Sequence, residues 1–373
     1  MSHAVSPTAT QAVEKPSPTA PNRRRFLIDT AAAILASSAA VTTATAEQWV
    51  NLDGRSNAPT GRPQHPNLLT PYGTRRPPWK VAGVDYRVGV QSGVVLKPIA
   101  QIHNPNVQVD TANRIIRMSG HDYTVDGFDF SGWTLYIQAQ RVIIQNCKST
   151  QPRAFAVFAP NTDPAPWFPM DITFRYCEMS GFGVQSLNDL WSFIALRGGG
   201  TMVVEYCWLT HSCAHIYETT LSANSRGIFR YNLETEIGTG DPVNHVNFTQ
   251  VWGGSSSAQH LFTFNCMVNH RQFAGGQMVQ VAGTNSLVAN NTMLALTTPE
   301  PGFSGGTEGI SHMFDPGHAG EFVTGCVIRD NYIDNSGVAF DVFHSNAAKP
   351  SITVTGNKNM LNGKTINKNN SEV

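Results

Sequence analysis

The hexapeptide ITFRYC, residues 172–177, belongs to a motif that recurs along the chain at a regular spacing. Thirty residues earlier the chain reads VIIQNC (142–147), and thirty residues later it reads MVVEYC (202–207). Each copy opens with β-branched or aromatic residues in partial alternation, which favours a strand with one buried face. Because self-similarity at such a period is typical of solenoids, the motif predicts a repeating architecture.

The last residue of the motif defines a column of thiol and amide side chains. Further copies end in GIFRYN, LFTFNC, LVANN, VIRDN and TVTGN, and the segment 124–132 fits as an earlier unit with Phe128 in the column. The column then contains Cys147, Cys177, Cys207, Asn232, Cys266, Asn291, Asn331 and Asn357. Successive members are 30, 30, 25, 34, 25, 40 and 26 residues apart, so the repeat averages 30 residues.

Each unit contains three short strand-like segments, with a variable insert before the third. No 3.6-residue period is present, which argues against a solenoid of helices. Three strands per unit make one turn of a parallel β-helix, in which each strand pairs with its counterpart about 4.8 Å further along the axis. The sequence therefore predicts an all-β fold, a parallel β-helix (solenoid) of about eight or nine coils.

The column predicts a tight corner between the first and second strands of each coil. An Asn at this corner can bond its amide to the Asn of the next coil, which produces a ladder. A Cys is small and tolerates burial, so Cys147, Cys177 and Cys207 are expected in adjacent coils. Disulfides between them are conceivable, but strand-neighbour geometry is often wrong for one, and we expect free thiols. The six cysteines form no CxxC pair, which argues against a zinc site of the usual spacing.

The first 46 residues have the organisation of an export signal. The stretch NRRRFLI (22–28) precedes an Ala-rich stretch that ends in small residues. A basic segment, a short weakly apolar stretch and a small-residue end predict a signal peptide cleaved after Ala46. The RRxFL pattern at 23–27 resembles a twin-arginine signal, so the twin-arginine translocase is an expected partner. This predicts a bacterial protein exported to the periplasm or the extracellular space.

Composition narrows the classes of partner and divides the chain into regions. Lys+Arg and Asp+Glu number 26 each, whereas a nucleic-acid binder usually shows a basic excess, so no nucleic-acid partner is expected. No stretch of the mature chain is long and apolar enough to span a membrane.

Residues 47–106 are rich in proline and predict an irregular cap over the first coil. The β-helix is expected at 107–360, and 361–373 is expected to be a frayed polar tail.

The three-strand coil with an Asn corner resembles the right-handed parallel β-helix of pectin-lyase-like proteins. The resemblance covers about Val107 to Asn359 and implies a single right-handed helix with an irregular N-terminal cap. That family includes polysaccharide lyases, glycoside hydrolases, epimerases, phage tailspikes and adhesins. The resemblance therefore implies a carbohydrate partner, but the fold alone does not name the reaction.

The third strands predict a ligand surface. Their apolar residues are expected to point inward, namely Phe158, Leu196, Tyr217, Val251, Val281, Phe314 and Phe343. The residues that follow are then expected to point outward, namely Ala159, Arg197, Glu218, Trp252, Ala282, Asp315 and His344. Arg, Trp and carboxylates on one rigid face suit an acidic sugar chain, although a solvated sheet face is the alternative.

A lyase acting on an acidic (uronate) polysaccharide must neutralise the substrate carboxylate and abstract the proton at C5. In pectate-lyase-like enzymes an Arg or Lys is the base and calcium rests on acidic residues, so the resemblance implies Arg271 or Arg197 as base. The candidate calcium ligands are Glu218, Glu234, Glu236 and Asp241. Glu218 and Asp241 are also catalytic candidates. The expected substrate-binding residues are Trp252, His245, Gln250, Asp315 and His344.

Hydrolysis is the alternative chemistry. A carboxylate pair for hydrolysis lies about 5–5.5 Å or 6.5–9.5 Å apart. Glu218 and Asp315 are expected three coils apart, about 14 Å, and cannot form such a pair. A hydrolase would need Glu218 together with Asp241 or Glu234. We therefore expect β-elimination ahead of hydrolysis, with a non-catalytic carbohydrate-binding or structural role as the third alternative.

Overall fold

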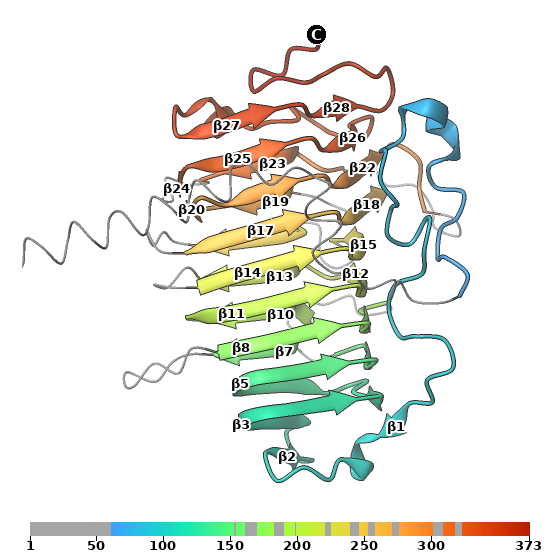
Figure 1. Cartoon of the computed structure of the whole chain (residues 1–373), viewed down its shortest axis with the longest axis vertical. Coiled ribbons are helices and arrows are strands. Elements are labelled where there is room, and N and C mark those ends of the chain that lie inside the picture. Colours follow the sequence, from blue (N-terminus) through green and yellow to red (C-terminus); the bar gives the residue numbers. More distant parts are fainter. Residues whose placement is uncertain are drawn as a thin grey trace, which may run out of the picture. The chain divides into compact units, whose positions relative to one another are not determined.

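The computed structural model describes residues 61–152, 154–160, 170–182, 190–197, 199–220, 225–238, 246–252, 258–270, 276–300, 309–317 and 323–373. Strands dominate these residues and wind into a spiral (Figure 1). The named strands pair in parallel, except β2 (Val107–Asp110) with β3 (Ile115–Asp126). The fold is a right-handed parallel β-helix, which confirms the expectation from the repeats.

The first face of the helix carries the repeated motif. Ile172 pairs with Val142 on one side and with Met202 on the other, so the copies align without a register shift. This first face consists of β3 and β5 (Thr134–Gln145), β8 (Met170–Arg175), β11 (Gly200–Glu205), β14 (Ser225–Arg230), β17 (Gln259–Thr263), β21 (Leu287–Ala289), β25 (Cys326–Arg329) and β27 (Ile352–Thr355).

The second face consists of shorter strands that follow the column. They are β1 (Lys97–Pro98), β4 (Phe128–Asp129), β6 (Lys148–Thr150), β9 (Glu178–Ser180), β12 (Trp208–Ser212), β15 (Leu233–Ile237), β18 (Cys266–His270), β22 (Thr292–Leu296), β26 (Tyr332–Asp334) and β28 (Lys358–Asn359).

The third face follows the inserts. It joins the first face through β5, whose Leu135 pairs with Val157. Its strands are β7 (Ala154–Pro160), β10 (Leu190–Arg197), β13 (His215–Thr220), β16 (Thr249–Trp252), β19 (Gln277–Val281) and β23 (His312–Pro316). A small sheet of β20 (Gly283–Thr284) and β24 (Val323–Thr324) and the 3-10 helices η1 (Thr70–Arg75), η2 (Ile99–Gln101) and η4 (Ser345–Ala348) complete the described elements.

An asparagine ladder runs along the corner between the first and second faces, as the column predicted. Each Nδ2 donates to the Oδ1 of the next coil: Asn232 to Asn265 at 3.0 Å, Asn265 to Asn291 at 3.1 Å, Asn291 to Asn331 at 2.9 Å and Asn331 to Asn357 at 2.8 Å. All five side chains are buried. Placing Cys266 in the column was wrong, because Cys266 pairs with Leu233, one residue beyond the corner. The amide of Asn265 bonds to both neighbouring coils and is a stronger donor and acceptor than a thiol.

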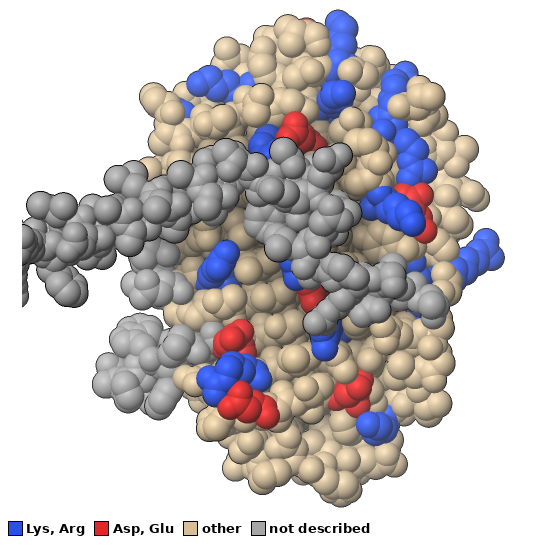
Figure 2. All heavy atoms as spheres, in the orientation of Figure 1, with Lys and Arg blue, Asp and Glu red and all other residues tan. Residues whose placement is uncertain are grey.

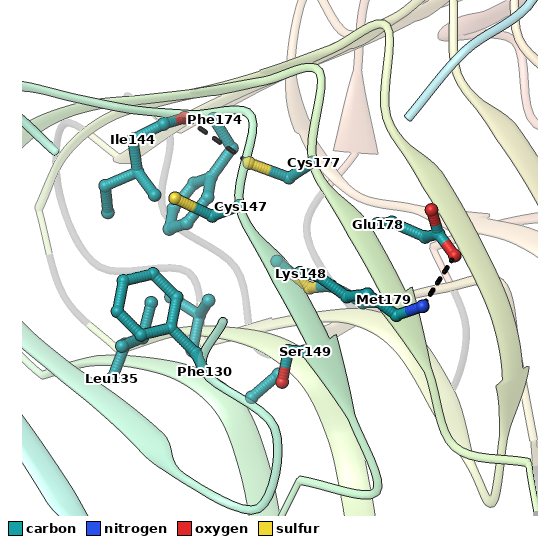
Figure 3. Close-up of a pocket in the computed structure, with 12 residues that line it drawn as sticks. Phe130, Leu135, Ile144, Cys147, Lys148, Ser149, Phe174, Cys177, Glu178 and Met179 are labelled. Atoms are coloured by element: carbon teal, nitrogen blue, oxygen red, sulfur yellow. Dashed lines mark hydrogen bonds and ion pairs between the residues drawn. The ribbon is translucent and has the colours of Figure 1, made fainter. Parts of the chain in front are cut away.

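The cysteine part of the column continues the ladder toward the N-terminus. The backbone N–H of Cys177 donates to Sγ of Cys207 at 3.4 Å, and that of Cys207 donates to Oδ1 of Asn232 at 2.9 Å. Figure 3 shows Cys147 and Cys177 in neighbouring coils, while the next residues, Lys148 and Glu178, pair at 3.6 Å. All six cysteines are free and buried, which confirms the expectation of free thiols.

The residue before each column position has a left-handed backbone. Those other than glycine have φ between 52° and 59°: Asn146, Tyr176, Tyr206, Tyr231, Phe264, Asn290 and Asp330. The conformation turns the chain tightly, at a cost of roughly 1–3 kcal/mol for a residue other than glycine. Four of these rings stack along the corner with centroids 5.1–5.5 Å apart, which offsets part of that cost.

The chain before the first coil is irregular, but it does not lie over the first coil alone. Figure 1 shows it passing along the strands of the second face toward β1. Tyr72 donates its hydroxyl to Asp334, and Arg75 donates to the carbonyl oxygen of Leu361, so the segment begins beside the last coils. The N–H of Gly89 donates to the carbonyl oxygen of Tyr206 near the middle of the helix. We call residues 61–96 the strap.

The C-terminal segment is packed, so the expectation of a frayed tail was wrong. Ile366 is 1% exposed and lies in the hydrophobic core, and its N–H donates to the carbonyl oxygen of Asn357. Asn359 donates to the carboxylate of Glu372 at 2.6 Å. One apolar residue among polar neighbours is enough to cover the open end of the core.

The predicted signal peptide, 1–46, lies outside the described residues. In the part described, no helix is long and apolar enough to cross a membrane.

Replacing Asn265 by Ala should destabilise the protein by roughly 2–4 kcal/mol, because it leaves the amides of neighbouring coils without partners in a buried corner. Chemical denaturation measures the loss, with the exposed Asn369→Ala as the matched control. Equal stability of the two variants would show that the ladder is not a stabilising element.

Candidate functional site

The structure corrects the predicted outward row of the third face. Strand pairing aligns Glu218 with Ala195 and Gln250, and Gln280 with Asp315. Arg197 and Trp252 both align with Thr220, two residues further along the strand. Ala282 follows Val281, so it is displaced in the same way, and Ala159 pairs with the core residue Leu196.

The error has a simple cause. Apolar residues recur at every second position of these strands, so matching them allows a slip of two residues without a change of face. Phe158 instead shows a slip of one residue: it aligns with Ala195 in the outward row, not with the inward residues. The predictions for Glu218 and Asp315 hold, and His344 follows Phe343, which bridges to Phe314 beside Asp315.

Glu218 and Gln250 of this row are buried and bonded to neighbouring side chains. Arg197 Nη2 lies 2.5 Å from Oε1 of Glu218, which is 2% exposed. Gln250 is also 2% exposed and accepts a hydrogen bond from Asn247 at 3.0 Å. The side chains of Glu218 and Gln250 therefore already have polar partners within the protein.

The C-terminal end of the row has the same character. Asp315 is 0% exposed and accepts from Asn346 Nδ2 at 2.9 Å, and Nδ1 of His344 lies 3.3 Å from Oδ1 of Asp315. The remaining members of the predicted set, Arg271, Asp241 and His245, lie outside the described residues, as does the side chain of Trp252.

The structure does not bring the described candidate calcium ligands together. Glu218 points out of the third face, whereas Glu234 and Glu236 belong to β15 of the second face. Glu234 aligns with the core residues Leu209 and Met267, and neither of its oxygens has a hydrogen-bond partner among the described residues. No group of three or more His, Cys, Asp or Glu in the described ranges is arranged to hold a metal ion.

A different site lies where the strap crosses the second face. A pocket of about 460 Å³ opens between residues 62–68 and strands β12, β15 and β18. This is a typical size for a small-molecule site. Six ionisable side chains line it: Arg62, His65, His211, Glu236, His270 and Glu300. We call it the strap pocket.

His270 and Glu236 form a closely bonded pair in the strap pocket. Nδ1 of His270 lies 2.6 Å from Oε1 of Glu236, and the N–H of His270 donates to Oε2 at 3.1 Å. Burial raises the pKa of Glu236, although the bond to His270 opposes this. Burial lowers the pKa of His270, but the hydrogen bond and the charges of Glu236 and Glu300 outweigh it, so the pKa of His270 is raised overall. The pair therefore holds its proton to a higher pH than a free imidazole would.

His211 and Glu300 form a second pair across the same pocket. Nε2 of His211 lies 3.1 Å from Oε2 of Glu300, and Nδ1 lies 2.7 Å from the hydroxyl of Thr210. That hydroxyl accepts from Thr235 at 2.7 Å and is thus oriented to donate to the imidazole. His211 and Glu236 both have a left-handed backbone, with φ of 59° and 57°. Both residues lie at the corner between the second and third faces. The left-handed conformation there turns both side chains toward the strap pocket.

His65 differs from the other two histidines. Its ring has no hydrogen-bond partner among the described residues, and burial lowers its pKa, with a further contribution from His270, against the opposing charge of Glu300. It is therefore a neutral base at neutral pH. Arg62, three residues earlier in the chain, is exposed at the rim of the pocket. One imidazole that favours the neutral form and one that favours the protonated form face the same space, which is the arrangement that acid–base catalysis requires.

The sequence reasoning missed this site because its members come from separate regions. His65 and Arg62 lie in the segment that carries no repeat, and Glu300 lies in an insert. Glu236 was predicted, but as a calcium ligand. The available signal was the recurrence of His or Glu near the end of the second strand of successive units, as in WLTH, LETE and MVNH.

Comparison of the chain with models of protein families, with curated proteins and with solved structures found no match. The fold therefore rests on strand pairing, and the function rests on the chemistry of the sites. Figure 2 shows acidic and basic side chains interspersed over the face in view. Among the described residues visible on that face, no large area carries charge of one sign.

Glu234 should make stability depend on pH. Burial raises its pKa from 4.5 to about 8, so the folded state binds a proton that the unfolded state has lost. Its stabilising, protonated form is fully present below pH 4.5, and the free energy of unfolding falls as the pH rises toward 8. Glu234→Met, which matches its core neighbours, should be more stable than the parent by roughly 2–5 kcal/mol at pH 8 and should flatten this slope.

Denaturation at several pH values measures both effects, with the exposed Asp171→Asn as the control. An unchanged slope in Glu234→Met would show that the carboxyl is solvated or paired in the folded protein.

Proposed function

We propose that the protein is an exported enzyme that cleaves an acidic (uronate) polysaccharide by β-elimination in the strap pocket. The observation that carries the proposal is the meeting of a neutral imidazole, His65, and a proton-carrying imidazole, His270, in one pocket with the guanidinium of Arg62. Elimination from a uronate needs a base, an acid and a cation. The strap pocket supplies all three.

Each group has a defined role in the proposed reaction. Arg62 binds the substrate carboxylate and stabilises the negative charge that develops when the C5 proton leaves. His65 takes that proton. The C4–O4 bond breaks as the C4=C5 double bond forms, and His270 donates its proton to O4 of the departing sugar. Glu236 holds Nδ1 of His270 and leaves its other ring nitrogen to face the substrate.

The charge of Glu300 acts to raise the pKa of both histidines. Its charge favours the protonated form of His270, and it limits how far burial lowers the pKa of His65. Through its contact with His211 it also fixes the wall of the pocket. The charge of Glu300 therefore acts on both the proposed base, His65, and the proposed acid, His270.

The proposal reassigns the base that the family resemblance implied. Arg197 faces Glu218 on the third face, so it belongs to a different surface from the strap pocket. Arg271 follows His270 directly but lies outside the described residues. The proposed steps are assigned to side chains of the strap pocket alone.

A glycoside hydrolase is the second candidate, because two carboxylic acids, Glu236 and Glu300, line the same pocket. Burial raises the pKa of Glu236, as a general acid requires. Export follows in either case from the predicted signal peptide of residues 1–46, which supports an action outside the cytoplasm.

His65→Asn and His270→Asn should each lower the rate of cleavage by at least roughly 100-fold, since each removes a proton-transfer group. The mature protein is incubated with a panel of uronate polymers, and unsaturated ends are followed by ultraviolet absorbance. His103→Asn, outside the strap pocket, is the matched control. Reducing ends without that absorbance would replace the lyase by the hydrolase, and binding without either product would indicate a non-catalytic binder.

The rate of β-elimination should follow a bell-shaped pH profile. The pKa of His65 is lowered from 6.5, so the rising limb, where His65 loses its proton, lies below pH 6.5. The pKa of His270 is raised from 6.5, so the falling limb, where His270 loses its proton, lies above pH 6.5. His270→Asn should remove the falling limb from the residual activity. Limbs that are identical in this variant and in the parent protein would rule out His270 as the acid.

A further inference from the structure

A tryptophan lines the strap pocket and takes no part in the proposed acid–base chemistry. Trp208 is the first residue of β12, and its side chain lines the pocket together with the apolar side chains of Leu68 and Val268. His211 lies three residues further along the chain, about 10 Å away at the usual rise of a strand. The pocket therefore has an aromatic wall at the start of β12 and ionisable groups at its end.

The side chain of Trp208 is held in place by the strap. Trp208 is half-buried and packs against the apolar cluster between the strap and the second face. Its backbone N–H donates to the carbonyl oxygen of Cys177 at 2.9 Å. A Cβ atom on Gly89 of the strap would lie only 3.3 Å from the Cβ of Trp208, so the strap passes directly beside this side chain. The ring is therefore a fixed surface that is partly open to the pocket.

Packing within the protein does not explain why this residue is a tryptophan. Its Nε1 is buried and has no hydrogen-bond partner among the described residues, although a buried indole N–H usually finds one. Tyr206 and Tyr231 at the nearby corner stack on each other, whereas no described ring stacks on Trp208. A phenylalanine would pack here without an unpaired donor. What the tryptophan contributes is a larger aromatic face at the wall of the pocket.

We propose that Trp208 is the platform of a sugar subsite in the strap pocket, on which a pyranose ring of the bound uronate chain stacks. This inference rests on the proposed function, which supplies the class of substrate. The face of an aromatic ring is electronegative, and the C–H bonds of a pyranose carry partial positive charge, so the two surfaces attract each other. Ligand pockets commonly combine aromatic walls with a few polar groups that fix orientation, and the strap pocket has both.

The subsite binds a sugar unit next to the one that reacts. The proposed acid, His270, lines the same corner of the pocket as His211, so Trp208 lies about 10 Å from the reacting groups along the strand direction. A chain that contacts both lies along β12, between the strap and the second face. Trp208 touches no reacting atom and is therefore a binding residue, which affects the affinity for the chain more than the chemical step.

Steady-state kinetics on a uronate polymer test the subsite. Trp208→Leu should raise KM roughly threefold to tenfold, the loss expected for one aromatic contact, with a much smaller change in kcat. Trp208→Phe keeps an aromatic face and should retain a KM close to that of the parent protein. Trp133→Leu is the matched control, because Trp133 is also half-buried but packs against the core beside the first coils. Chemical denaturation of each variant measures any change in stability.

A second readout needs no turnover and does not depend on the leucine variant. The intrinsic tryptophan fluorescence of the parent protein should change when the uronate polymer is added. Trp208→Phe should lose most of this change and yet be retarded like the parent protein in affinity electrophoresis through gels that contain the polymer. A full fluorescence response in Trp208→Phe would overturn the subsite, because no ring would then be reporting the sugar at position 208.

The remaining outcomes separate the subsite from the proposed reaction. An unchanged KM and retardation in Trp208→Leu, or an equal effect of Trp133→Leu, would overturn the subsite and leave the lyase standing. Retardation that depends on Trp208 without any cleavage would keep the subsite and reject the lyase. No binding of the polymer by the parent protein would reject both.

Discussion

The contact between successive coils at the corner of the first and second faces is the constraint on which the rest of the structure depends. A left-handed residue turns the chain, and the next side chain bonds to its counterpart in the following coil. In a solenoid each coil contacts mainly its neighbours, so stability is a sum of such contacts. Where the amide changes to a thiol, as between Asn232 and Cys207, the backbone N–H groups still find partners. The corner thereby keeps the three faces in register from one coil to the next.

This regularity explains how much of the fold was predictable. The motif that ends at Cys147, Cys177 and Cys207 has a constant length, so its register followed directly from the letters. The third strands follow inserts of variable length, so nothing in the chain fixes their alignment except alternating apolar residues. Such a pattern is equally satisfied two residues further on, and Arg197 and Trp252 were misplaced for this reason.

The candidate site was harder to predict because it depends on contacts that have no local pattern. Glu218 was correctly expected to point outward, but its pairing with Arg197 is a property of neighbouring coils. Glu234 and Glu236 are two residues apart on one strand, yet one enters the core and the other lines the strap pocket. Alternation along a strand would place residues two apart on the same face, so the separation follows from the left-handed backbone at Glu236, and the presence of His65 opposite Glu236 follows only from the path of the strap.

That path ties the site to the far end of the polypeptide. The strap supplies Arg62 and His65, and it is anchored by Tyr72 to Asp334 and by Arg75 to the backbone of Leu361. These anchors belong to the last coils to leave the ribosome. A chain that lacks these coils therefore contains most of the spiral but neither anchor of the strap, so the wall that Arg62 and His65 supply is held in place only when the last coils are present.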